Sequence, residues 1–134
     1  MIQQLFLTSA QWAEIQHHVS AQSPLEACGL LAGKNDSVEE IICVTNQAQS
    51  EVRFVMDPYE QLSAFQWMES HHLDLVGIFH SHPSGPETAS PTDIAEAAYA
   101  VVHVIVSPRG TSWGARGFWI ENGVAEEVTL HIRE

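Results

Sequence analysis

Two histidines one residue apart, followed by an aspartate, are the first residues in this sequence that suggest chemistry. The stretch "HSHPSGPETASPTD" runs from His80 to Asp93 and follows the apolar run "LVGIF". Because side chains alternate along an extended chain, His80 and His82 point to the same side of a strand. Asp93, in the first turn of a following helix, can turn back as a third ligand. The spacing predicts an open His-His-Asp metal site.

The types of these ligands favour a catalytic zinc ion, one per chain. Zinc binds histidine nitrogen and carboxylate oxygen at about 2.0–2.2 Å, and three protein ligands leave a fourth position for water. Such a water ionises near neutral pH and attacks a carbonyl, provided that another residue takes its proton and delivers it to the leaving amine. Two histidines and a carboxylate also form the facial triad of non-haem iron oxygenases, so ligand types alone leave the metal open.

The elements that must position these residues follow from hydrophobic periodicity and from helix and turn signals. Helices and strands alternate, with hairpins near both ends, which predicts an α/β or α+β fold with a mixed sheet flanked by helices. One helix begins at Thr8, with Gln11 reaching back to the cap, and ends before Pro24. The other expected helices run from Pro58 to about His71, with Leu62, Phe65 and Met68 inward, and from Ser90 with Ile94, Ala97 and Val101 inward; the expected strands are 26–33, 38–44, 52–56, 73–79, 101–107, 112–121 and 124–132.

Length and charge limit the function further. With 134 residues the chain is long enough for one domain, 1–134, and too short for two ordinary ones. The formal net charge of −12 offers no basic stripe for nucleic acid or anionic lipid, so we expect a neutral or basic partner. The sequence has no signal-peptide pattern and no apolar segment long enough to span a bilayer, so a cytoplasmic location is expected.

Two cysteines are too few for a disulfide scaffold, and they do not form a CxxC pattern. A hairpin that is symmetric about Asn35 and Asp36 places Cys28 directly opposite Cys43, within reach of a cross-strand bond. In a reducing cytoplasm we expect free thiols, with a disulfide forming only on oxidation. Because the cysteines form no metal-binding pattern, any metal must be held by nitrogen and oxygen ligands.

The motif resembles the signature of the JAMM (MPN-plus) metalloproteases. "HSHP" is followed after six residues by Ser90 and after two more by Asp93, and Glu26 lies far upstream in "EACGLLAG". The resemblance covers nearly the whole chain and is strongest to the compact prokaryotic members. It implies a cytidine-deaminase-like JAMM architecture, zinc on His80, His82 and Asp93, Glu26 as general acid/base, and a Ser90 hydroxyl that supports the oxyanion.

The resemblance also implies a substrate class. JAMM enzymes cut the amide or isopeptide bond after the C-terminal Gly-Gly of ubiquitin-like proteins, and prokaryotic members act on modifier or sulfur-carrier proteins of that fold. An extended diglycine tail can pair with an exposed strand, and a narrow channel admits glycine while rejecting side chains. Whether the leaving group is a protein lysine or a free amino acid such as cysteine stays open, as does the choice between monomer and homodimer.

Other interpretations of the same residues remain. Ser90 and Asp93 also form an ordinary helix-capping pair, and Glu26 alone would more often be a solvated strand residue. A non-catalytic MPN-type scaffold for protein binding is a third class of function beside hydrolase and iron enzyme. It is disfavoured because every position of the catalytic motif is filled.

Overall fold

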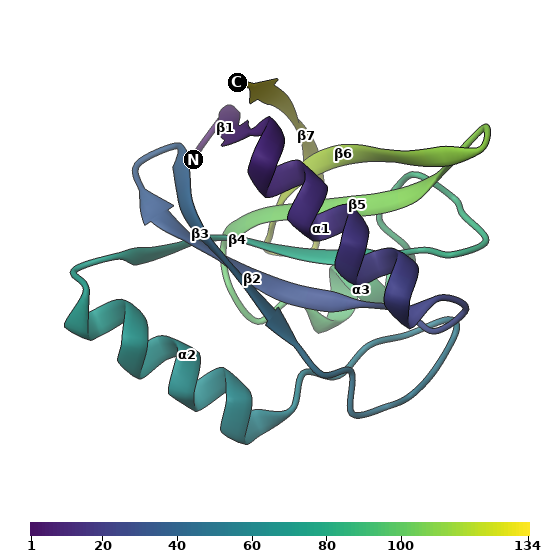
Figure 1. Ribbon diagram of the computed structural model, residues 1–134, viewed down its shortest axis with the longest axis horizontal. Helices are drawn as coiled ribbons and strands as arrows, with labels where there is room; N and C mark the ends of the chain where they lie inside the picture. The colour runs from purple at the N-terminus through teal and green to yellow at the C-terminus, as the bar shows by residue number, and fades with distance from the viewer.

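Seven strands form one mixed sheet that closes on itself, and three helices pack on its two faces (Figure 1). The computed structural model describes residues 1–134. The strand order is β1-β3-β2-β4-β5-β6-β7, and β1 closes the sheet by pairing in parallel with β7 and, through Phe6 and Ser37, with β3. The elements are β1 Gln4–Thr8, α1 Ser9–Gln22, β2 Cys28–Lys34, β3 Ser37–Val44, α2 Pro58–Ser70, β4 Asp74–Ser81, α3 Pro91–Glu96, β5 Val101–Arg109, β6 Ser112–Glu121 and β7 Val124–Arg133. The predicted mixed sheet flanked by helices is confirmed.

Helix α1 crosses one face of the sheet (Figure 1). It begins as predicted, because the Thr8 side chain accepts a hydrogen bond from the Gln11 N–H while the Gln11 side chain accepts one from the Thr8 N–H. Ile15 and Val19 are fully buried in a cluster of 14 core residues. This cluster is the main hydrophobic core, and it fixes the sheet from which the site projects.

Helices α2 and α3 cover the opposite face. Ala64 and Met68 of α2 are buried one helical turn apart, as predicted for Met68, and Phe65 is partly buried. The expectation that Leu62 points inward is wrong, since Leu62 is 56% exposed. Leu62 lies two residues before Ala64, about 200° around the helix axis, and therefore faces solvent. No helix of the chain combines the length and the hydropathy needed to cross a membrane.

Three elements differ from the expectations by more than two residues at a boundary, or in whether the element exists. Strand β1 was not predicted, although Leu5 and Leu7 alternate into the core. Residues 52–56 form no strand and make one isolated bridge, between Asn46 and Met56. The third helix ends at Glu96, because Ala97 adopts an extended backbone with ψ of 113°. Val101 therefore begins β5 instead of continuing the helix.

The predicted pairing of Cys28 with Cys43 is wrong. The turn falls at Asn35 and Asp36 as expected, with Lys34 opposite Ser37. The register then shifts between Ala32 and Gly33, because Glu39 is an extra residue in β3, and Cys43 comes opposite Gly29. Cys28 is consequently buried on one face while Cys43 is exposed on the other, and both are free. A disulfide between them would require a different register of β2 and β3, in which both side chains point to the same face.

Candidate metal and catalytic site

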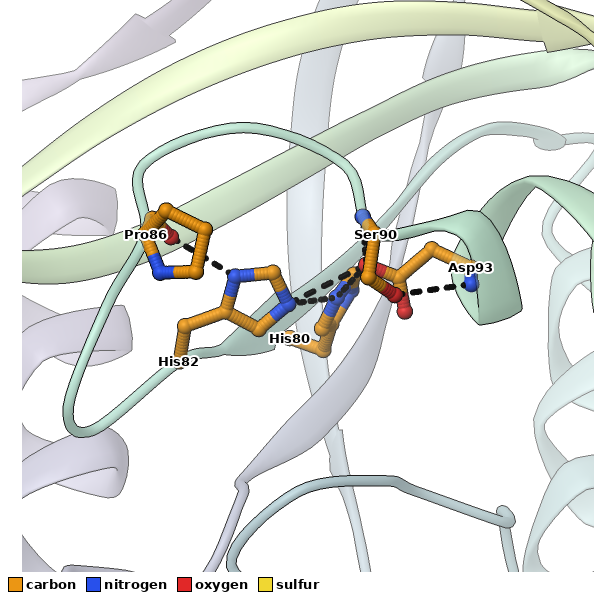
Figure 2. Close-up of polar contacts among 5 residues, drawn as sticks. All are labelled: His80, His82, Pro86, Ser90 and Asp93. Atoms are coloured by element: carbon orange, nitrogen blue, oxygen red, sulfur yellow. Dashed lines mark hydrogen bonds and ion pairs between the residues drawn. The ribbon is translucent and has the colours of Figure 1, made fainter.

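The two histidines lie at the end of β4, and both are buried. Strand alternation brings their rings together, with His80 Nε2 3.1 Å from His82 Nε2. Asp93, from the first turn of α3, places its Oδ2 atom 3.2 Å from His80 Nε2 and 3.1 Å from His82 Nε2. Figure 2 shows the three side chains pointing at one another. The structure thus brings the three predicted ligands into one nearly equilateral triangle of nitrogen and oxygen atoms.

This triangle fits a single metal ion. Adjacent ligand atoms of a tetrahedral zinc ion with bonds of about 2.0–2.1 Å are about 3.3 Å apart. Three ligands on one face of an octahedral iron ion would be about 3.0 Å apart. The edges of 3.1–3.2 Å lie between the two values. The donor set therefore suits a first-row divalent metal. The distances between the ligand atoms do not distinguish zinc from iron.

The surroundings of each histidine fix its ring. His82 Nδ1 lies 2.8 Å from the Pro86 carbonyl oxygen, as Figure 2 shows. Because that oxygen only accepts, Nδ1 carries the proton and Nε2 keeps the lone pair that a metal needs. The His80 ring stacks on Phe54 at 4.5 Å, and His80 Nδ1 is buried without a partner. Both rings thus present Nε2 to Asp93.

Ser90 is the N-cap of α3 and acts through Asp93. Its hydroxyl oxygen accepts a hydrogen bond from the Asp93 N–H at 3.0 Å, and its own N–H donates to Asp93 Oδ2 at 2.8 Å. The capping interpretation is therefore confirmed. The hydrogen bond from the Ser90 N–H also holds the Asp93 Oδ2 atom that faces the histidines. The helix cap therefore positions the third predicted ligand. The hydroxyl proton is not used by the cap, and the predicted oxyanion contact stays a prediction.

Sheet register explains how Glu26 reaches residues more than fifty positions away. In the antiparallel pair of β2 and β4, Cys28 lies opposite His80. The pairing continues beyond β2, since the Ser81 N–H donates to the Ala27 carbonyl at 3.0 Å and the Ala27 N–H donates to Ser81 Oγ at 2.8 Å. Glu26 then comes opposite His82. One carboxylate oxygen of Glu26 and one nitrogen of each histidine lie within 4.8 Å of one another.

The two carboxylates have different electrostatic environments. Glu26 is 3% exposed, and its Oε1 atom has no hydrogen-bond partner. Burial raises the pKa of Glu26 to about 7, with Asp93 adding to the rise and His82 opposing it. Burial also raises the pKa of Asp93, but the close contacts of its carboxylate with the His80 and His82 rings outweigh burial and hold that pKa well below the usual range. Asp93 is thus ionised near neutral pH, whereas Glu26 can exchange a proton there.

A buried amide that sequence reasoning missed holds Glu26 and the loop after β3. Asn46 is 6% exposed, and its Nδ2 atom donates to the Glu26 carbonyl at 3.0 Å and to the Arg53 carbonyl at 3.1 Å. Its Oδ1 atom accepts from the N–H groups of Ala48 and Val55. Nothing local in the sequence marks Asn46. Ser81 was also missed, and its place between the two histidines was the available signal.

Comparison with known proteins places the chain in a family. The family model described as prokaryotic homologues of the JAB domain matches residues 8–120. The chain belongs to this JAB family. The resemblance drawn from the "HSHP" motif is therefore confirmed for the family.

Named relatives of this JAB-domain chain include a probable TtuB-protein conjugate cleaving protease of Thermus thermophilus, 36% identical over 96% of this chain and 82% of that protein. A CysO-cysteine peptidase of Mycobacterium bovis is 33% identical over 87% of this chain and 83% of its own length. A solution structure of a Desulfitobacterium hafniense protein matches with a TM-score of 0.88 and 32% identity, covering 97% of this chain and 93% of that one. A JAB1/MPN domain protein of Archaeoglobus fulgidus, with a TM-score of 0.62 over 96% of this chain and 97% of its own at 23% identity, shares the fold.

Proposed function

We propose that this JAB-domain chain is a zinc-dependent peptidase that hydrolyses the amide or isopeptide bond after the C-terminal Gly-Gly of a ubiquitin-like modifier or sulfur-carrier protein. His80, His82 and Asp93 hold the zinc ion, and Glu26 is the general acid/base. The observation that carries the proposal is the triangle of 3.1–3.2 Å edges with the unpartnered Glu26 carboxylate beside it. The names of the relatives support the reaction class, because one is named a conjugate cleaving protease and the other a peptidase.

Zinc, when bound, supplies Lewis acidity that activates a water molecule and polarises the scissile carbonyl. The chain's own residues move the protons. Glu26 accepts a proton from the attacking water and delivers it to the departing amine nitrogen, a role that suits a carboxylate whose pKa burial has raised. Its position opposite His82 puts it on the same side of the sheet as both histidines. Ser90 donates its free hydroxyl proton to the carbonyl oxygen as negative charge develops there.

The carrier's tail would reach the site as an extended segment. Glycine residues at the cleaved end carry no side chains, so the backbone around the scissile bond can approach the site closely. The net charge of −12 favours a carrier with a neutral or basic surface. Nucleic acid and membrane lipid are poor partners for the same reason.

The alternatives are an iron enzyme and a metal-free scaffold. To test the metal and the reaction, the purified protein is stripped with EDTA and reloaded with zinc or with ferrous iron. We expect cleavage of a Gly-Gly-extended carrier by hydrolysis, which mass spectrometry detects as two products whose summed mass exceeds that of the substrate by one water. The double variant His80→Ala/His82→Ala should lose bound zinc and nearly all cleavage. Full zinc occupancy in that variant would remove these residues from the metal site. A protein that binds carriers but never cleaves them, with any metal, would favour the scaffold.

A further inference from the structure

A cavity of about 270 Å³ lies beside Asp93, between residues 53–56 and the segment that joins α3 to β5. Most of its lining is apolar, including Phe54, Met56 and Tyr99. Phe54 also stacks on the His80 ring, so the wall of the cavity is shared with the proposed metal site. The cavity therefore adjoins the place where the scissile bond would lie.

A Gly-Gly tail would leave this cavity empty. Glycine has no side chain, and a space of about 270 Å³ next to a proposed metal ligand has room for an amino-acid side chain. The residue on the other side of the scissile bond, which carries the leaving amine, is the part of the substrate that can fill it. The cavity is thus better suited to the leaving group than to the tail of the carrier.

One cation lines the cavity. Arg53 is one of five Lys and Arg residues in the chain, and no other lysine or arginine is part of the lining. Its Nη2 atom lies 3.6 Å from Glu96 Oε1, with both side chains about half exposed. An exposed pair at that distance is weak and exchanges readily. The Arg53 backbone is nevertheless fixed, because its carbonyl oxygen accepts a hydrogen bond from Asn46 Nδ2 at 3.1 Å.

We propose that this cavity is a leaving-group pocket for a single free α-amino acid, whose carboxylate is bound by Arg53 in place of Glu96. The inference rests on the proposed function and narrows it. Water adds to the glycine carbonyl carbon, the C–N bond breaks, and the nitrogen leaves with a proton as the amine of the amino acid. The α-carboxylate is unchanged by the reaction. A protein lysine offers no carboxylate beside its ε-nitrogen, so Arg53 favours the free amino acid.

The test compares matched substrates with the zinc-loaded protein. A carrier ending in Gly-Gly is extended by one alanine or one cysteine, as the free acid or as the carboxamide, and a third substrate joins the same glycine to a lysine side chain. We expect the acid to be cleaved with a kcat/KM at least about tenfold above the amide, because a hydrogen bond to a charged group is worth that much. Arg53→Gln should abolish the preference, and Glu96→Gln should increase it.

Arg133→Gln is the matched control, because Arg133 does not line the cavity and lies instead over the Phe6 ring of β1. Binding of free alanine and alanine amide to metal-free protein, followed by NMR, gives a readout independent of turnover. We expect shifts at residues 53–56 and 96–99 for the acid, and weaker binding to Arg53→Gln. Cleavage of acid and amide at equal rates, a preference that survives Arg53→Gln, or faster cleavage of the lysine substrate overturns the leaving-group pocket and leaves the peptidase intact. No cleavage of any substrate overturns both.

Discussion

At the scale of single residues, Glu26 combines deep burial with an oxygen that has no partner. Glu26→Gln keeps the shape of the side chain but cannot carry a proton. We expect unchanged zinc content and melting temperature, with turnover lowered by about 10²–10⁴-fold, the usual contribution of a general acid/base. Metal analysis, thermal unfolding and steady-state kinetics measure the three quantities. Glu14→Gln on the exposed side of α1 is the control, and a Glu26→Gln enzyme as fast as its parent would remove Glu26 from the mechanism.

Ser90 has one established role and one predicted role, which substitution can separate. Ser90→Ala removes both the cap and the hydroxyl, and should cost about 1 kcal/mol of stability. Ser90→Asn keeps a capping oxygen without the hydroxyl, so its stability should be close to that of the parent. If the hydroxyl supports the oxyanion, both variants turn over slowly. Full turnover in a folded, zinc-loaded Ser90→Asn protein would show that capping is the whole role of Ser90.

A buried histidine outside the ligand set gives stability a pH dependence. Burial, helped by His80, lowers the pKa of His103 from 6.5 to about 4. Between these values the unfolded chain binds a proton that the folded chain refuses, so this contribution to stability is lost as pH falls from about 6.5 to 4. In metal-free protein we expect a loss on the order of 3 kcal/mol across this window. Urea unfolding at pH 7 and pH 4.5 should show a smaller loss in His103→Gln, whereas exposed His17→Gln should behave as the parent.

At the scale of elements, α3 depends on the site as much as the site depends on α3. The helix has six residues and buries none of them, which is too short for stability on its own. Its position comes from the Ser90 cap, from the contacts of Asp93 with the two histidines, and from the partial packing of Ile94 against β5 and β6. Removing the metal should therefore loosen residues 83–97. Hydrogen exchange with and without EDTA should show faster exchange there and no change in residues 74–79 of β4; uniform faster exchange would contradict this dependence.

The elements that the sequence predicted are those with local signals. Thr8 with Gln11 and Ser90 with Asp93 are capping pairs three residues apart, and both begin helices in the structure. Strand β1 has only five residues, so the alternation of Leu5 and Leu7 is a short signal, and its partner β7 lies at the other end of the chain. The extra residue Glu39 shifts the register of a hairpin whose turn residues alone do not reveal the shift. The turn at Asn35 was therefore predicted correctly, whereas the pairing of Cys28 with Cys43, which lies beyond the register shift, was not.

At the scale of the whole molecule, the site is a product of sheet register. The motif gave the histidines and Asp93, whose spacing is local, and the resemblance pointed to Glu26. The alignment of β2 with β4 that puts Glu26 opposite His82 could not be derived from either strand alone. Asn46 and the cavity beside Asp93 join three separate segments, and no pattern in the sequence marks them.

Closure of the sheet should contribute measurably to global stability. Leu5 of β1 is fully buried in the main core cluster, next to strands from both ends of the chain. Leu5→Ala should lower the free energy of unfolding by about 2–5 kcal/mol in a single cooperative transition. Val52→Ala, at a side chain that is 82% exposed, should change it little. Urea unfolding measures both, and a loss below 1 kcal/mol for Leu5→Ala would mean that β1 is peripheral.

The parallel pairing of β1 with β7 joins Gln4 to Thr129 and Thr8 to Arg133, and Figure 1 shows the two chain termini close together. During synthesis the first strand leaves the ribosome long before its partner exists. Strand β1 can therefore complete its pairing with β7 only after more than a hundred further residues have been added to the chain. Pairs of such wide sequence separation slow folding, because loop closure comes before the contacts that reward it. The first strand of the chain is thus among the last to complete its hydrogen bonding.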